Sequence, residues 1–192
     1  MPINIPILLT WLRIVLIPLL VSVYYFPEDW LTPEGRNSAA TLIFIIAALT
    51  DWLDGYLARR WQQTSAFGAF LDPVADKLMV AVALIVLVQL ARLDAILAAI
   101  IIGREITISA LREWMAQIGA QRSVAVSMIG KIKTTAQMSA IPLLLYDSSL
   151  GSVNVAEMGT WLIYIAAVLT LWSMGYYMRM AWPHLIEEDR WR

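Results

Sequence analysis

Long apolar stretches follow one another along this chain, separated by short polar segments. They cover about residues 7–26, 38–58, 76–91, 93–111, 134–147 and 157–182. A helix needs about 20 apolar residues to cross the hydrocarbon layer of a membrane, and the first and last stretches approach that length. The pattern predicts an all-α membrane protein with six transmembrane helices.

The third stretch is short when it is counted from Leu78. A helix that begins near Asp72 would be more than a turn longer, with its polar start at the membrane surface. A re-entrant helix is the alternative. Segments 27–37 and 147–156 contain several of the residues Pro, Gly, Asp, Ser and Asn, so we expect turns there.

Composition agrees with this pattern. The chain has 192 residues, of which 60% are hydrophobic and 15% charged, and its mean hydropathy is +0.68. These values are typical of a polytopic membrane protein. No internal repeat or flexible linker divides the sequence, so we expect one domain over residues 1–192. The first apolar stretch contains Arg13 and Pro18 and has no small-residue cleavage site, which favours a retained helix over a signal peptide.

The basic residues indicate how the helices are oriented. Six spans place both termini on one side, and twelve of the 14 Lys and Arg residues then fall on that side. The twelve are Arg13, Arg59, Arg60, Lys77, Arg104, Arg112, Arg122, Lys131, Lys133, Arg179, Arg190 and Arg192. Only Arg36 and Arg92 lie opposite. Because basic residues favour the cytoplasmic side, we expect both termini in the cytoplasm.

The remaining composition excludes several kinds of site. Net charge is −1 and there is no basic tail, so a nucleic-acid partner is not expected. The absence of cysteine excludes disulfides, thiolate nucleophiles and sulfur-ligated zinc. The one histidine, His184, lies far from the acidic motifs in sequence and is interpreted as an interfacial surface residue.

Two aspartate pairs stand beside the apolar stretches. They are Asp51-x-x-Asp54-Gly55-x-x-Ala58-Arg59 and Gly68-x-x-x-Asp72-x-x-x-Asp76. Residues three and four apart share one face of a helix, so each motif presents its carboxylates on one face. Carboxylates are costly at a membrane and usually functional. Four of them close together would repel one another, which predicts a divalent cation, either Mg²⁺ or Mn²⁺.

Small residues in the same motifs could bring the two helices together. Gly55, Ala58 and Gly68 lie on the faces that carry the aspartates and would allow close backbone approach. For Asp72 another role is open, because Asp72-Pro73 resembles the N-cap and first position of a helix.

A metal site at the membrane surface, flanked by Arg59 and Arg60, suits a diphosphate attached to a lipid. Phosphoryl transfer depends mainly on positioning and electrostatics. With no cysteine or well-placed histidine to form a covalent intermediate, direct displacement by an acceptor hydroxyl is favoured. Asp76, next to Lys77, is the candidate base.

Further cations follow downstream. Arg104 and Arg112 would lie roughly 12 Å apart along a helix. With Lys131 and Lys133 they could grip the phosphate of a small acceptor. The alternative for the arginines is snorkelling, or pairing with their neighbours Glu105 and Glu113. The two lysines, two positions apart, cannot share a helix face, so one of them is expected to bind the phosphate.

The pattern D-x-x-D-G-x-x-A-R-x8-G-x-x-x-D-x-x-x-D is complete from Asp51 to Asp76, and the chain therefore resembles the CDP-alcohol phosphotransferases. It is most similar to the bacterial phosphatidylglycerophosphate synthase branch of that family. The shared positions are Asn4-Ile5-Pro6, Leu9-Thr10, Arg13, Gly103-Arg104-Glu105, Leu111-Arg112 and Gly130-Lys131-x-Lys133-Thr134.

This resemblance implies a six-helix integral membrane fold, usually a homodimer, with a polar cavity open to the cytoplasm of the bacterial inner membrane. It implies transfer of the phosphatidyl group from CDP-diacylglycerol to an alcohol, with release of CMP. In this branch the acceptor is sn-glycerol 3-phosphate.

The resemblance also implies roles for individual residues. The ligands of a dinuclear metal site would be Asp51, Asp54, Asp72 and Asp76. Asp72 and Asp76 would be catalytic, with Asp76 as the base. The CDP moiety would be held by Asn4, Thr10, Arg13, Asp54, Gly55, Ala58, Arg59 and Gly68. The acceptor phosphate would be bound by Arg104, Arg112, Lys131 and Lys133.

Three alternatives remain open on the sequence. The same chemistry could use inositol phosphate, serine or phosphatidylglycerol as acceptor. An ion-coupled transporter could carry intramembrane carboxylates, although discontinuous helices and repeated halves are not evident. Prenyl transfer also uses aspartate-rich motifs, and it would release inorganic diphosphate rather than CMP.

Overall fold

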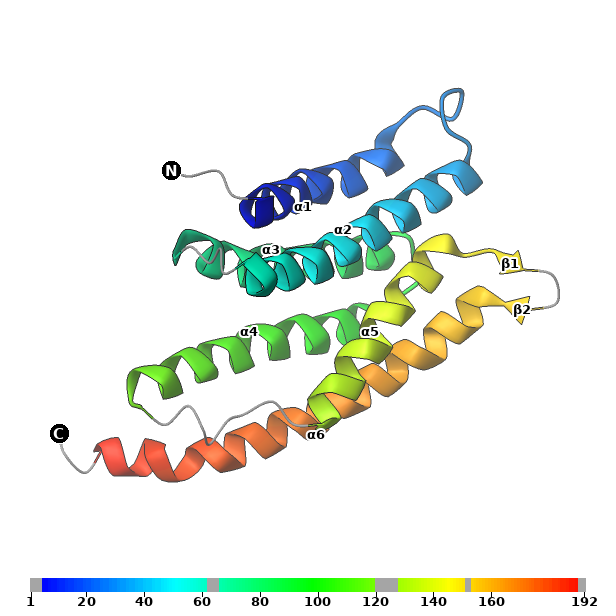
Figure 1. Ribbon diagram of the computed structural model, residues 1–192. Helices are drawn as coiled ribbons and strands as arrows, with labels where there is room; N and C mark the ends of the chain where they lie inside the picture. Colours follow the sequence, from blue (N-terminus) through cyan, green and yellow to red (C-terminus); the bar gives the residue numbers. More distant parts are fainter. Residues whose placement is uncertain (1–4, 62–65, 120–127, 151–152, 190–192) are drawn as a thin grey trace.

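The computed structural model describes residues 5–61, 66–119, 128–150 and 153–189 (Figure 1). Its helices are α1 (Ile5–Ser22), α2 (Pro33–Trp61), α3 (Ala66–Gln89), α4 (Ala95–Gln117), α5 (Met128–Tyr146) and α6 (Val155–Asp189). A short 3₁₀ helix, η1 (Val23–Tyr25), follows α1. Strands β1 (Ser149–Leu150) and β2 (Val153–Asn154) form a small antiparallel pair before α6. The predicted all-α class is confirmed, and the strand pair was not foreseen.

The helices form a bundle in which the chain passes back and forth. The start of α1 and the end of α6 lie at the same end of the bundle (Figure 1). The α1–α2 turn, the α3–α4 turn and the β1–β2 pair lie at the opposite end (Figure 1). The aspartates near the end of α2 and the start of α3 therefore lie at the end that bears the termini.

Helix α3 differs from the expectation for its start. It begins at Ala66 and runs for 24 residues through Pro73. Asp72 therefore lies inside the helix, and the hypothesis that it caps the N-terminus is wrong. The length of α3 also speaks against a re-entrant helix, since 24 residues span about 36 Å at 1.5 Å per residue.

The apolar surface of the bundle is as expected for a protein in lipid. Stretches in three helices are long and apolar enough to cross a membrane: Ile7–Tyr25, Pro33–Leu57 and Val155–Trp182. Large apolar side chains such as Val15, Trp161 and Trp172 are exposed on them. Helices α3 and α4 carry buried or half-buried charges, and these belong to the site described below.

One apolar core joins all six helices. It includes Leu20 of α1, Phe44 of α2, Leu84 of α3, Ile101 of α4 and Ile141 of α5. Its contribution from α6 is Ile163. Helices α5 and α6 pack closely, and a Cβ atom added to Gly159 would lie 2.9 Å from Leu144 Cγ. Glycine therefore sets the separation of these two helices.

A polar cluster closes the end of the bundle opposite the termini. Arg92, in the α3–α4 turn, forms an ion pair with Asp147, with 2.9 Å between Nε and Oδ2. It also donates hydrogen bonds of 2.9 Å to Asn37 Oδ1 and to the Leu145 carbonyl oxygen. These contacts tie α2, the α3–α4 turn and the end of α5 together.

Candidate active site

The first two aspartates, on α2, share one arginine of α1. Arg13 is 1% exposed, although it is a charged residue. Its guanidinium lies 3.0 Å from Asp51 Oδ1 and 2.6 Å from Asp54 Oδ2. Asp54 is itself 4% exposed, whereas the Asp51 side chain is 42% exposed. A buried carboxylate needs a partner, and Arg13 supplies it here.

The second aspartate pair, on α3, also contacts α1. Thr10 Oγ1 donates a hydrogen bond of 2.5 Å to Asp72 Oδ1. Thr10 is one helical turn from Arg13, so both face the same way. Helix α1 packs extensively against both α2 and α3, which also contact each other. Helix α1 therefore links the two motifs, and close approach of α2 and α3 through their small residues stays a prediction.

Asp76, on α3, is influenced by charged residues of both predicted groups. It is half-buried and lines a small cavity with Arg13, Met79 and Met138. The charges of Asp51, Arg13 and Glu105 all act on it. Glu105 belongs to α4 and pairs with Lys133 of α5, so charges from both predicted groups act on Asp76.

The donors suit a hard divalent cation. The motifs supply carboxylate oxygens, which are the ligands that Mg²⁺ and Mn²⁺ prefer. The charge of Asp54 interacts with those of Asp51 and Asp72. Within the described residues, no three Asp, Glu or His side chains converge as a group that could hold an ion. Arg13 balances part of the negative charge in this arrangement.

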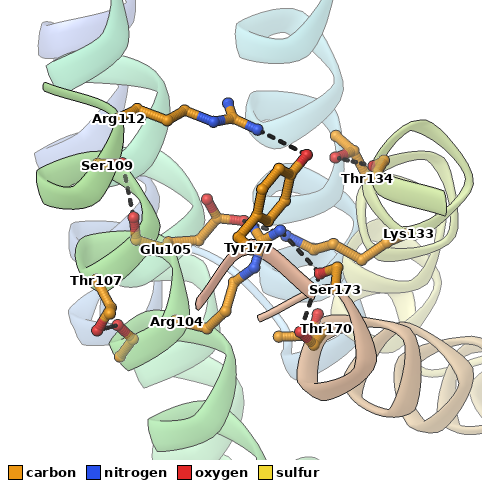
Figure 2. A network of polar contacts seen from close by, with 12 residues as sticks. Arg104, Glu105, Thr107, Ser109, Arg112, Lys133, Thr134, Thr170, Ser173 and Tyr177 are labelled. Atoms are coloured by element: carbon orange, nitrogen blue, oxygen red, sulfur yellow. Dashed lines mark hydrogen bonds and ion pairs between the residues drawn. The ribbon is translucent and has the colours of Figure 1, made fainter. Parts of the chain in front are cut away.

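The downstream cations meet around Glu105 (Figure 2). Arg104 is 7% exposed and lies 3.4 Å from Glu105 Oε1. Lys133 reaches from α5 and pairs with the same Glu105 oxygen. Arg112, on the same side of α4, donates a hydrogen bond of 3.1 Å to the Tyr177 hydroxyl of α6. Three of the predicted phosphate-binding side chains thus gather in one place.

Pairing of Arg104 and Arg112 with their neighbouring glutamates, the alternative to phosphate binding, is found only in part. Glu105 pairs with Arg104 and Lys133, whereas Glu113 is exposed. Two donors stay unused, because the buried Nε atoms of Arg104 and Arg112 have no hydrogen-bond partner in the described part of the chain. Of the two lysines, Lys133 is the buried one at 1% exposed.

Some predicted site residues cannot be placed. Asn4 and the side chains of Ala58, Arg59 and Lys131 lie outside the described residues. Gly68 is buried near the start of α3, and Gly55 is half-buried on α2.

Sequence reasoning missed Ser173 and Tyr177 of α6, which contact the two arginines. The available signal was a pair of polar groups four residues apart within an apolar stretch.

A cavity of about 140 Å³ lies between α3 and α4. Lys77 and Glu105 line it at its polar side, and its other walls are apolar, including Leu78, Ile101 and Ile106. Lys77 follows Asp76 in the sequence and Glu105 pairs with Lys133, so this cavity is lined by a neighbour of the aspartate motif and by a member of the downstream cluster.

Comparison with known proteins agrees with this geometry. The sequence model of the family described as CDP-alcohol phosphatidyltransferase matches residues 3–172. Relatives from Yersinia enterocolitica and Escherichia coli K12 are each 51% identical, covering 97% and 98% of this chain and 100% of their own length. Both relatives are named CDP-diacylglycerol–glycerol-3-phosphate 3-phosphatidyltransferase. Since the family match covers most of the residues that form the bundle and both charged groups, this chain belongs to the CDP-alcohol phosphatidyltransferase family.

Proposed function

We propose that this protein transfers the phosphatidyl group of CDP-diacylglycerol to sn-glycerol 3-phosphate, giving phosphatidylglycerophosphate and CMP. The observation that carries the proposal is that Asp76 is influenced both by the charges of Asp51 and Arg13 in the aspartate group and by the charge of Glu105, which pairs with Lys133 in the cationic group. The first group suits a metal-bound diphosphate and the second a phosphate. The names of the near-full-length relatives support the same reaction.

The aspartates would hold the metal. The family generally depends on a divalent metal, and we assign a dinuclear Mg²⁺ or Mn²⁺ site to Asp51, Asp54, Asp72 and Asp76. When bound, such ions neutralise diphosphate oxygens and stabilise charge on the leaving CMP. The CDP moiety would lie along Thr10, Arg13, Gly55 and Gly68, with Asn4, Ala58 and Arg59 completing this region. Asp54 belongs to both sets.

The reaction would be a single displacement. The acceptor hydroxyl oxygen attacks the phosphorus of the phosphatidyl group, and its proton passes to an Asp76 carboxylate oxygen. The bond from that phosphorus to the bridging oxygen breaks, and CMP leaves with this oxygen. Asp72, held by Thr10, would keep the reacting groups aligned.

The acceptor phosphate would bind in the cationic group. Among the described side chains there, the positive charges of Arg104, Arg112 and Lys133 exceed the single negative charge of Glu105 by two. A phosphate monoester carries about −1.5 to −2 at neutral pH, so the charges are complementary. Lys131 would add to the same region. Neutral or zwitterionic acceptors such as serine fit this cluster less well.

The wider arrangement follows from the same proposal. Residues 1–192 form one membrane domain, which we place in the bacterial inner membrane as a homodimer among membrane lipids. Both termini and the active site would face the cytoplasm, where the soluble acceptor is found.

A turnover assay tests the reaction. Purified protein in detergent is given CDP-diacylglycerol and radiolabelled glycerol 3-phosphate, with and without Mg²⁺, and both CMP and lipid-extractable label are followed. We expect metal-dependent release of CMP in equal amount to labelled lipid.

Other results would redirect the assignment. CMP without labelled lipid would mean another acceptor, such as inositol phosphate or phosphatidylglycerol. Absence of both products from folded protein would contradict the proposed function and return attention to prenyl transfer or ion transport.

A further inference from the structure

Two polar side chains of α6 contact the arginines of α4 that are assigned to the acceptor phosphate. Ser173 is 1% exposed and Tyr177 is fully buried. They are four residues apart and therefore lie on one face of α6. Figure 2 shows both reaching from α6 toward α4, each against a different arginine.

Ser173 fixes Arg104. Its hydroxyl oxygen accepts a hydrogen bond of 2.9 Å from one terminal nitrogen of the guanidinium. The Ser173 hydroxyl in turn donates to the Thr170 carbonyl oxygen at 3.0 Å. Because its proton is engaged by the backbone, the Ser173 oxygen is held with its lone pairs toward Arg104.

Tyr177 fixes Arg112 in two ways. Its hydroxyl accepts a hydrogen bond of 3.1 Å from the guanidinium, which also lies 5.1 Å from the centre of the ring. A cation at this distance is attracted by the ring face. The ring packs in a small apolar cluster with Ile108, Met115 and Ala181, which holds it in one orientation.

These contacts matter because free arginine side chains are mobile. An arginine side chain has many rotamers, and binding an anion with a mobile side chain loses part of that rotamer entropy. Side chains that are ordered beforehand bind more tightly. The Nε donors of both arginines remain without a partner within the described residues, so ordering does not use up the donors.

We propose that Ser173 and Tyr177 are positioning residues for the acceptor phosphate, acting through Arg104 and Arg112. The inference rests on the proposed function. It predicts that α6, which carries no predicted binding residue, sets the affinity for the acceptor while leaving the affinity for the lipid substrate unchanged.

The test compares Michaelis constants in two variants. Ser173→Ala removes the acceptor of the Arg104 hydrogen bond, and Tyr177→Phe removes the hydroxyl but keeps the ring. A hydrogen bond to a charged group is worth enough that we expect each variant to raise the KM for glycerol 3-phosphate by about 5- to 10-fold. The KM for CDP-diacylglycerol should stay within about twofold of wild type, since uniform structural damage would move both.

The test also includes inhibition by inorganic phosphate and a control variant at a neighbouring tyrosine. The inhibition constant of phosphate, measured in competition with glycerol 3-phosphate, should rise by the same factor in both variants. Tyr176→Phe is the matched control, because Tyr176 is 48% exposed, and its KM values should be those of wild type.

Each outcome is decisive. If wild type labels lipid but both variants keep the wild-type KM for glycerol 3-phosphate, or if both Michaelis constants rise in parallel, the positioning role is overturned. If wild type labels no lipid from glycerol 3-phosphate, the proposed function fails before the variants are compared.

Discussion

Arg13 looks like an uncompensated charge in the sequence, but the structure gives it two partners. In the sequence it is a lone cation in the first apolar stretch, where membrane burial is costly. In the structure it lies between Asp51 and Asp54. Its charge is compensated by carboxylates that come from a different helix, which the sequence of α1 alone does not reveal.

Removing this charge should unfold the site end of the bundle more easily. Arg13→Gln leaves Asp54, at 4% exposed, without its cation. Breaking a buried pair costs about 3–5 kcal/mol, so we expect a clearly lower thermal unfolding temperature in detergent. Added Mg²⁺ should raise the unfolding temperature of the variant by more than it raises that of wild type. A ligand that binds only the folded state stabilises that state.

Arg179→Gln serves as the control, since Arg179 is exposed on α6. An Arg13→Gln protein that unfolds at the wild-type temperature would mean that the ion pairs contribute little to stability.

Asp76 is the proposed general base, so its substitution should affect the rate of the reaction. Asp76→Asn keeps the shape of the side chain but cannot accept a proton. General-base catalysis contributes about 10²- to 10⁴-fold, so kcat should fall by at least about 100-fold. The measurement is CMP release by a variant whose helical content and unfolding temperature match wild type.

The matched control is Asp29→Asn, in the exposed α1–α2 turn, which should keep full activity. Substantial residual turnover in Asp76→Asn would remove the base assignment.

Among the helices, the contact of α5 with α6 depends on one glycine. Gly159→Ala would bring its Cβ within 2.9 Å of Leu144 Cγ and 3.1 Å of Leu143 Cβ. Overpacking of this kind costs about 1–3 kcal/mol, and we expect a matching loss in the free energy of unfolding. Gly175→Ala, on the same helix with nothing within 4 Å, should be neutral or stabilising.

A second substitution checks the cause. Leu144→Ala is itself destabilising, but combined with Gly159→Ala it should cost less than the sum, because it removes the nearest of the clashing atoms, Leu144 Cγ. Simple additivity would show that the two side chains do not meet.

The helices also show where local patterns mislead. Asp72-Pro73 resembles a helix start, yet α3 begins at Ala66. The preceding residues are mostly apolar, and in an apolar environment the backbone must satisfy its hydrogen bonds within the helix. The helix therefore extends over these residues despite the proline, and Asp72 bonds to Thr10 of α1.

In the whole molecule, the two ends of the bundle have different character. The end with the termini carries the aspartate and cationic groups, and the other end carries the polar cluster around Arg92. The buried Nε atoms of Arg104 and Arg112, which have no hydrogen-bond partner within the described residues, lie at the first end, as does a cavity lined by Lys77 and Glu105, which is why we place the chemistry there.

The orientation of this molecule in the membrane can be measured directly. The chain has no cysteine, so one introduced cysteine reports on one position. We expect Asp29→Cys to react with a membrane-impermeant maleimide in intact spheroplasts. Gln117→Cys, exposed at the active-site end of α4, should react only after the membrane is permeabilised. The reverse pattern would place the active site outside the cytoplasm.

The amino-acid sequence by itself is enough to predict where the helices lie, that they alternate in direction, and which residues make up the two charged groups. Hydrophobic length and helical periodicity are local properties, so they can be read without a fold. The pairing of these groups is not local. That Thr10 and Arg13 of α1 hold aspartates of two other helices depends on how three helices pack. That Ser173 and Tyr177 support two arginines of α4 depends on the packing of α6. The hydrogen bonds among these contacts join residues 41 to 69 positions apart, and only the folded chain brings their atoms within hydrogen-bonding distance.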